Sequence, residues 1–182
     1  LKDRFLKLRE TPLSALPRPL SLEDCDGHLI LLEEWVEGRP WKEAVLSRES
    51  ALEFGKELFD LLAELTDLNL VHGQLSPHNL LIESSSGYLK LLGLLSRPPG
   101  HRDGSERDLR DALACLQRLI RPDEFTELSR FNSPLEISRR LNLLLCQVDT
   151  TGSQSELVGR ELAMQDLSEG YSEGGMAAGK AP

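Results

Sequence analysis

The residues with the most obvious chemical potential lie together in one polar segment, His72-Gly73-Gln74-Leu75-Ser76-Pro77-His78-Asn79. The segment offers two imidazoles, two amides and a hydroxyl, but no carboxylate. His72 and His78 do not have the spacing of a helical metal pair, and no carboxylate-rich partner lies beside them. Gln74 carries a neutral amide, which has no anionic site to take a proton. The residue types therefore argue against a metal centre and against a general base at position 74.

Elements with clear sequence signals flank this segment and must hold it in place. Before it, a capping box at Ser50 and apolar residues at helical spacing predict a helix over ~51–68. After it, the apolar runs 80–82 and 88–92 enclose a Ser-Gly turn and predict a hairpin. A helix over ~105–120 and another that begins at Ser133-Pro134 complete this part of the chain.

The region before the long helix is less regular. Leu29–Leu32 is a continuous apolar run, which predicts a buried strand that continues into a turn closed by Gly38 and Pro40. An amphipathic stretch around Phe5 and Leu8 begins almost at residue 1, which is Leu, so we expect the chain to be a fragment of a longer protein. Together these elements predict an α+β fold that is mainly α-helical.

Composition narrows the class of protein. The 182 residues include 21 Lys and Arg against 30 Asp and Glu, a net charge of -9, which argues against a nucleic-acid partner. No apolar run is long enough to span a membrane and no signal peptide opens the chain, so no membrane partner is expected. The three cysteines are far apart, without metal or disulfide spacing. We expect a cytoplasmic protein.

The order of helix, loop, hairpin and helix becomes specific at the polar segment. His72–Asn79 resembles the catalytic loop of the protein-kinase-like fold, which reads H-R-D-L-x-P-x-N in protein kinases and H-G-D-L-x-x-x-N in their small relatives. Lys90–Leu95 falls where the family has K-L-x-D-F-G. The resemblance covers roughly residues 1–148 and implies the large lobe of a kinase-like domain, with the small lobe largely missing.

The same resemblance assigns roles outside the loop. Leu32–Gly38 resembles the hinge between the lobes, so Glu34, Trp35 and Val36 would be the hinge residues that meet a bound nucleotide. His72 is expected to be a structural residue of the loop. Asp108 is expected to be the structural aspartate that braces the loop from the start of a helix. The family's Gly-rich loop and strand lysine would lie before Leu1.

The family's cofactors are ATP and Mg²⁺, and its phosphoryl transfer needs carboxylates that this sequence lacks. Gln74 stands in place of the catalytic Asp, and Ser76 in place of the loop Lys of protein kinases. Gly93 stands in place of the D-F-G Asp, so Asn79 alone survives among the expected metal ligands. These losses predict weak nucleotide and metal binding at most, and a pseudokinase variant of a bacterial-type Ser/Thr kinase.

The leading hypothesis is thus a regulatory or binding module in cytoplasmic signalling that acts through a protein partner. The predicted organisation is 1–38 for the end of the small lobe and hinge, 39–148 for the large lobe and 149–182 for a flexible tail. One alternative is an active phosphotransferase, a protein Ser/Thr kinase or a small-molecule kinase. Another is the N-terminal stub of a kinase–ATPase fusion, because 157–162 resembles the L-V-G-R-E box that opens AAA-type signalling ATPases.

Overall fold

The structure is a computed structural model that describes residues 1–95 and 104–148. Contacts divide the chain into two units, Leu1–Leu145 and Cys146–Pro182, and the elements that build the site belong to the first. The predicted tail, including the ATPase-like box, lies outside the described residues. Within the described ranges, no helix combines the length and apolar content needed to cross a membrane.

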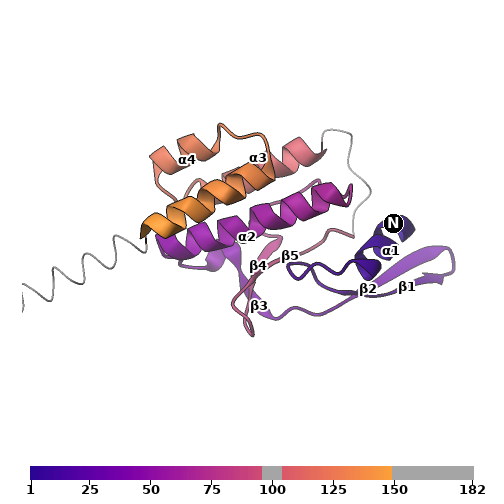
Figure 1. Ribbon diagram of the computed structural model, residues 1–182. Helices are drawn as coiled ribbons and strands as arrows, with labels where there is room; N and C mark the ends of the chain where they lie inside the picture. Colours follow the sequence, from indigo (N-terminus) through magenta and orange to yellow (C-terminus); the bar gives the residue numbers. More distant parts are fainter. Residues whose placement is uncertain (96–103, 149–182) are drawn as a thin grey trace, which may run out of the picture. The chain divides into compact units, whose positions relative to one another are not determined.

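Six elements precede the polar loop, in the order α1, β1, β2, β3, η1 and α2, and the strands β4 and β5 follow it. Their bounds are α1 Lys2–Glu10, β1 Pro19–Cys25, β2 His28–Glu33, β3 Gly38–Pro40, η1 Trp41–Glu43, α2 Arg48–Asp67, β4 Leu80–Glu83 and β5 Leu89–Leu91. Then come α3 Gly104–Leu116, α4 Pro122–Leu128 and helical residues 134–148 (Figure 1). The mixture of helix and strand fits the predicted α+β class.

The long helix α2 is the centre of the core. Its buried face includes Leu52, Leu58, Phe59, Leu61 and Leu65, each at most 1% exposed. The helix begins one turn earlier than predicted, because the backbone N–H of Ser50 donates to the Ser47 side chain at 3.1 Å and makes Ser47 the N-cap. The capping box predicted at Ser50 was therefore wrong, although the helix itself was correctly predicted.

Two further helices pack against α2 through a glycine. A Cβ atom at Gly55 would lie 2.9 Å from the Leu116 side chain of α3 and 3.4 Å from that of Leu141. Only a residue without a side chain allows both helices to approach α2 this closely. The start of the last helix at residue 134 was predicted correctly, and α3 ends at Leu116, earlier than the predicted ~120.

A small antiparallel sheet of order β3-β4-β5 packs against α2 and contains the predicted hairpin. The β4–β5 register pairs Leu80 with Leu91 and Ile82 with Leu89. The backbone N–H of Leu89 donates to the Glu57 carboxylate of α2 at 2.8 Å, which fixes the hairpin to the helix. The residues predicted to close a turn, Gly38 and Pro40, instead form β3 and pair with β4.

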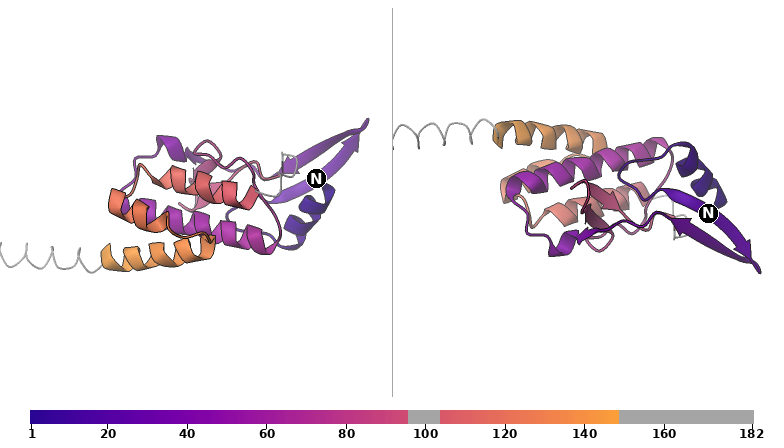
Figure 2. Two further views of the ribbon diagram at one scale, coloured as in Figure 1. Left: turned by 90° about the horizontal axis from the view of Figure 1, so that it is seen from above. Right: turned by 90° about the horizontal axis from the view of Figure 1, so that it is seen from below.

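A second, separate sheet contains only β1 and β2, joined by a tight turn at Asp26 and Gly27 with positive φ angles of 54° and 78°. It extends from the helices beside α1 (Figure 2). The predicted strand at 29–32 forms, but the prediction that it is buried was wrong. Leu29, Ile30 and Leu32 are 41%, 42% and 48% exposed, because β2 has only one neighbouring strand.

Candidate functional site

The polar loop begins where α2 ends. Asn69 adopts a left-handed conformation with φ 52°, and the N–H of Leu70 donates back to the Leu65 carbonyl at 2.7 Å. This end turns the chain sharply toward Val71 and His72. The helix terminus therefore sets the position of the loop.

Asp108 of α3 fixes the backbone of the loop at two consecutive residues. Its carboxylate accepts hydrogen bonds from the N–H groups of His72 at 2.7 Å and Gly73 at 2.8 Å. The side chain is 3% exposed, and this burial raises the pKa of Asp108, although the two N–H donors lower it in part. Gly73, with φ 78°, adopts the left-handed conformation that glycine tolerates. The structure thus places Asp108 against the loop that it was predicted to brace.

His72 links the loop to the segment that follows β5. The imidazole is 2% exposed, and its Nε2 lies 2.9 Å from the Leu92 carbonyl oxygen. The backbone N–H of Gln74 donates to Nδ1 at 3.3 Å, so the contacts assign the proton to Nε2. Gly93, the residue after Leu92, is thereby held near the loop.

The loop is also closed on itself through Asn79. The side-chain amide of Asn79 donates to the Gln74 carbonyl oxygen at 2.7 Å, and its backbone N–H donates to the Ser76 carbonyl at 3.0 Å. The Asn79 carbonyl accepts from the N–H of Leu92 at 2.7 Å. Gln74 itself is exposed. The structure therefore brings together the loop residues and the segment that contains Gly93.

The remaining predicted residues line a cavity of about 420 Å³, which we call the hinge cavity. Its lining consists of Pro17, Glu33, Glu34, Trp35, Val36, Glu37, Gly38, Leu81, Leu92 and Gly93. All three predicted hinge residues and Gly93 share this cavity, whereas His72, Gln74, Ser76, Asn79 and Asp108 are outside its lining. Leu92 connects the two parts, because it lines the cavity, its carbonyl oxygen is bonded to the His72 imidazole, and its N–H donates to the Asn79 carbonyl.

One residue of the site had no clear sequence signal. Arg4 of α1 is 8% exposed, and its Nη2 donates to the carbonyl oxygens of Val71 at 2.8 Å and Leu94 at 2.6 Å. It therefore ties α1 both to the start of the loop and to the segment after Gly93. Burial lowers the pKa of Arg4, while the negative charge of Asp108 raises it. An arginine in a short amphipathic stretch gives no indication of this long-range contact.

The predicted hinge residues and the loop do not provide the side chains that would bind a magnesium ion as protein kinases do. Among the described residues, no group of three or more His, Cys, Asp or Glu side chains is placed to hold a metal ion. Gln74 and Gly93 bring no carboxylate, which leaves the Asn79 amide oxygen as the one candidate ligand at the predicted metal positions. Hard cations such as Mg²⁺ bind through oxygen ligands and usually through carboxylates. The residues present therefore do not fit Mg²⁺.

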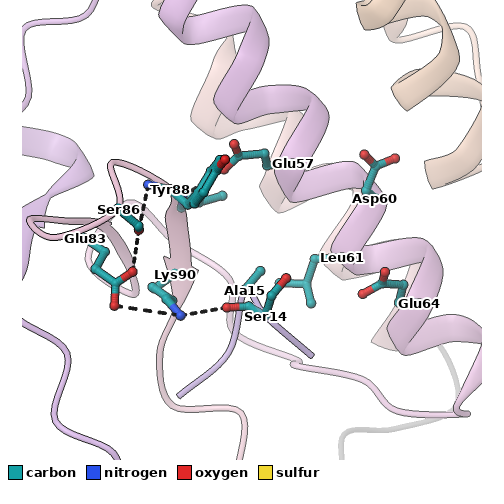
Figure 3. A pocket seen from close by; sticks show the side chains of 11 residues that line it. Ser14, Ala15, Glu57, Asp60, Leu61, Glu64, Glu83, Ser86, Tyr88 and Lys90 are labelled. Atoms are coloured by element: carbon teal, nitrogen blue, oxygen red, sulfur yellow. Dashed lines mark hydrogen bonds and ion pairs between the residues drawn. The ribbon is translucent and has the colours of Figure 1, made fainter. Parts of the chain in front are cut away.

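A second cavity of about 380 Å³ lies between α2 and the β4–β5 hairpin (Figure 3). Glu57, Asp60 and Glu64 of α2 line one side. Lys90 on β5 lies 3.9 Å from the Glu83 carboxylate and donates to the Ser14 carbonyl at 2.7 Å. None of the predicted site residues lines this cavity.

The arrangement of the elements matches protein kinase domains of known structure. The chain matches the kinase domain of Mycobacterium tuberculosis PknI, solved as a double mutant, with a TM-score of 0.56, 15% sequence identity and 79% of each chain covered. It matches Rad53 in complex with AMP-PNP with a TM-score of 0.53 and 14% identity, covering 76% of this chain and 45% of that chain. No protein-family model matches the sequence, and no curated protein matches it significantly. The predicted protein-kinase-like fold is confirmed.

Proposed function

We propose that the chain is a pseudokinase module: the end of a small lobe and hinge over 1–38, followed by a large lobe over 39–148. It would act in the cytoplasm by binding a protein partner and would not transfer phosphate. The observation that carries this proposal is a loop that is fully braced, by Asp108 and His72, around positions that lack the carboxylates for the chemistry, Gln74 and Gly93.

Other carboxylates in the described part of the chain give little support to a compensated active site. Asp108 is committed to the N–H groups of His72 and Gly73. Glu83 is paired with Lys90 in the second cavity. A general base must lie within hydrogen-bond reach of the proton that it removes, and both of these carboxylates are already engaged elsewhere.

Gly93 has a φ of 83°, in the left-handed region that glycine occupies most readily. Aspartate is among the few other residues that tolerate this region, as Asp26 of this chain does at φ 54°. Position 93 therefore supports the proposal through the absence of a carboxylate, and not through its backbone conformation.

The direct test is phosphoryl transfer by the purified 182-residue chain, with labelled ATP, Mg²⁺ and general protein substrates. We expect no transfer above a protein-free background. Asn79→Ala is the control, because it removes the one remaining family metal ligand. Transfer that is lost in Asn79→Ala would overturn the proposal and establish the alternative, an active phosphotransferase.

A further inference from the structure

Two adjoining cavities form one groove between α2 and the β4–β5 hairpin. The first is the cavity of about 380 Å³ described above, and the second, of about 300 Å³, extends from it toward the start of α2. Glu57 and Tyr88 line both cavities, so we treat them as one and call it the hairpin groove. Its α2 side reaches from Glu53 to Glu64, about 16 Å of helix, which matches about five residues of an extended chain.

The base of the hairpin groove is apolar. Leu61 of α2 and Leu89 of β5 line the first cavity and are each 1% exposed. The half-buried Leu145 lines the second. Beside them, the Tyr88 side chain is 64% exposed, which leaves much of a large aromatic ring in solvent. Such a surface can cover apolar side chains or the methylene stems of longer ones.

The rim of the groove is acidic, and the carboxylates of α2 lie along one side of the first cavity (Figure 3). The two lysines at the rim are already engaged, since Lys56 pairs with Asp60 at 2.7 Å and Lys90 lies 3.9 Å from a carboxylate of its own hairpin. In the part of the chain that the structure describes, Glu57 and Glu64 form no ion pair. The groove therefore has negative charge that the described residues leave uncompensated.

Glu57 lies where the two cavities meet. The backbone N–H of Leu89 donates to its carboxylate at 2.8 Å and fixes its position. Burial raises the pKa of Glu57, and the charges of Glu53 and Asp60 raise it further, although the Leu89 N–H and Lys56 lower it. A cation bound in the groove would offset this repulsion between like charges.

The charges of the chain itself argue for an occupant from another protein. Segment 149–182 contains six Asp and Glu against two Lys and Arg, and a second copy of the chain carries a net charge of -9. Either one would bring more negative charge to an acidic rim, which is unfavourable. A basic segment of a different protein is complementary to it.

We propose that the hairpin groove binds an extended segment of a partner protein in which basic and apolar residues alternate. The apolar side chains of the segment would contact the base of the groove, and its cationic groups would pair with Glu57 and Glu64 at the rim. This inference rests on the proposed function, because it takes the module to act through a protein partner. It names the surface that the partner contacts and the chemistry of the contacting segment.

Fluorescence anisotropy of a labelled peptide, titrated with the full 182-residue chain, tests the inference. The probe has about seven residues of alternating leucine and arginine, enough to span the groove. We expect it to bind at least about tenfold more tightly than a peptide with glutamate in place of arginine, or one with serine in place of leucine. Absence of binding would overturn the inference. Equal binding of the serine peptide would overturn it too, because net charge alone would then attract the probe.

Paired double variants locate the binding. Glu57→Gln/Glu64→Gln should weaken binding of the leucine–arginine probe about fivefold to tenfold, while glutamine at position 57 can still accept from the Leu89 N–H. Glu106→Gln/Glu136→Gln is the matched control, because it removes the same charge from exposed positions outside the groove, and its effect should be less than about twofold. Equal weakening in the two variants would contradict the inference. An unfolding curve of each variant shows whether a change in affinity arises from loss of structure.

Two further measurements test the other occupants. We expect an unlabelled peptide of residues 149–182 to leave the probe bound. Displacement of the probe would assign the groove to this segment of the chain and overturn the inference. Light scattering of the unmodified chain tests a second copy as the occupant. A dimer that dissociates in Glu57→Gln/Glu64→Gln would likewise overturn it.

The results also separate this inference from the proposed function. Phosphoryl transfer by the unmodified chain would overturn the proposed function whatever the order of peptide affinities. Absence of both transfer and probe binding would leave the assignment of an inactive kinase-like domain intact and remove the inference.

Discussion

At the scale of single residues, the loop depends on Asp108. One buried carboxylate satisfies two consecutive backbone N–H groups, those of His72 and Gly73, and so sets the conformation of the residues that follow. Buried donors left without an acceptor are costly, since folding has already removed them from water. Hydrogen bonds within the protein therefore maintain the conformation of the loop. This conformation does not depend on an acid or base at position 74.

We predict that Asp108→Ala lowers the free energy of unfolding by about 2–5 kcal/mol, because it leaves two buried N–H donors without a partner. The neighbouring Asp111, on the same helix, is the matched control. It forms only a 3.6 Å ion pair with Arg107 across one turn, so Asp111→Ala should cost less than about 0.5 kcal/mol. Denaturant unfolding of both variants measures the difference. Equal losses would show that Asp108 does not brace the loop.

Gly93 gives the second prediction at this scale. Gly93→Asp, which introduces the residue found in protein kinases, should lower stability by less than about 1 kcal/mol, because aspartate tolerates a left-handed φ such as 83° better than most residues with a Cβ atom. Gly87→Ala is a suitable reference, because Gly87 has φ 75° and nothing within 4 Å of a Cβ atom, so it reports the backbone cost alone. Thermal unfolding compares the two. A Gly93→Asp variant that loses more stability than Gly87→Ala would contradict this expectation.

At the scale of elements, a buried ion pair joins the start of α2 to α4. Glu124 is 1% exposed, and its carboxylate accepts from Arg48 Nε at 3.1 Å and from the backbone N–H of Arg121 at 2.9 Å. Burial would raise the pKa of Glu124, but the hydrogen bonds from Arg48 and Arg121 outweigh it, and the pKa is lowered from its ordinary value of 4.5. The charged form of this glutamate is thus the form that the fold stabilises.

The lowered pKa of Glu124 makes its contribution to the free energy of unfolding depend on pH. A carboxyl group whose pKa is lower in the folded state contributes stability above its unfolded pKa and loses it as pH falls through the folded value. We predict that Glu124→Gln is about 1–3 kcal/mol less stable at neutral pH. The gap between this variant and the unmodified chain should shrink below pH 4.5. Denaturant unfolding across pH measures it, with the exposed Glu136→Gln as a control that stays level with the unmodified chain. A constant gap would contradict the assignment.

At the scale of the whole molecule, apolar surface is distributed unevenly. The helices and the β3-β4-β5 sheet share a buried core, whereas the β1–β2 sheet leaves Leu20, Leu29, Ile30 and Leu32 between 41% and 49% exposed. A two-stranded ribbon gains little from burial on its own, and exposed apolar strands promote association. Its exposed leucines therefore contribute less to stability than the leucines of α2.

We predict that Ile30→Thr changes the free energy of unfolding by less than about 0.5 kcal/mol and raises the concentration at which the protein stays monodisperse. Leu58→Ala in the core should cost about 2–5 kcal/mol, because it removes a fully buried side chain. Denaturant unfolding and light scattering measure the two effects. A large loss of stability in Ile30→Thr would show that β2 is part of the main core.

The sequence by itself determined most of the local elements. Helical spacing from Ala51 to Leu68, the apolar pairs around the turn at 84–87 and the Ser133-Pro134 helix start are signals carried by neighbouring residues, and each element formed. Two elements were not predicted from the sequence. The strand β1 was missed, although Asp26-Gly27 is a strong turn signal. The helix α4 was missed, although Pro122 and two acidic residues mark its first turn.

Only the tertiary structure decided which groups meet. Arg4 reaches carbonyl groups at Val71 and Leu94 over sequence separations that no local pattern encodes. The contact of Asp108 with the loop was expected from the family resemblance alone, and the structure shows the hydrogen bonds that make it. The exposure of Leu29–Leu32 and the gathering of Glu33, Glu34 and Glu37 around one cavity also depend on which elements pack together. The physical reason is that hydrogen bonding and burial are properties of contacts between distant segments, whereas spacing and capping depend on residues a few positions apart.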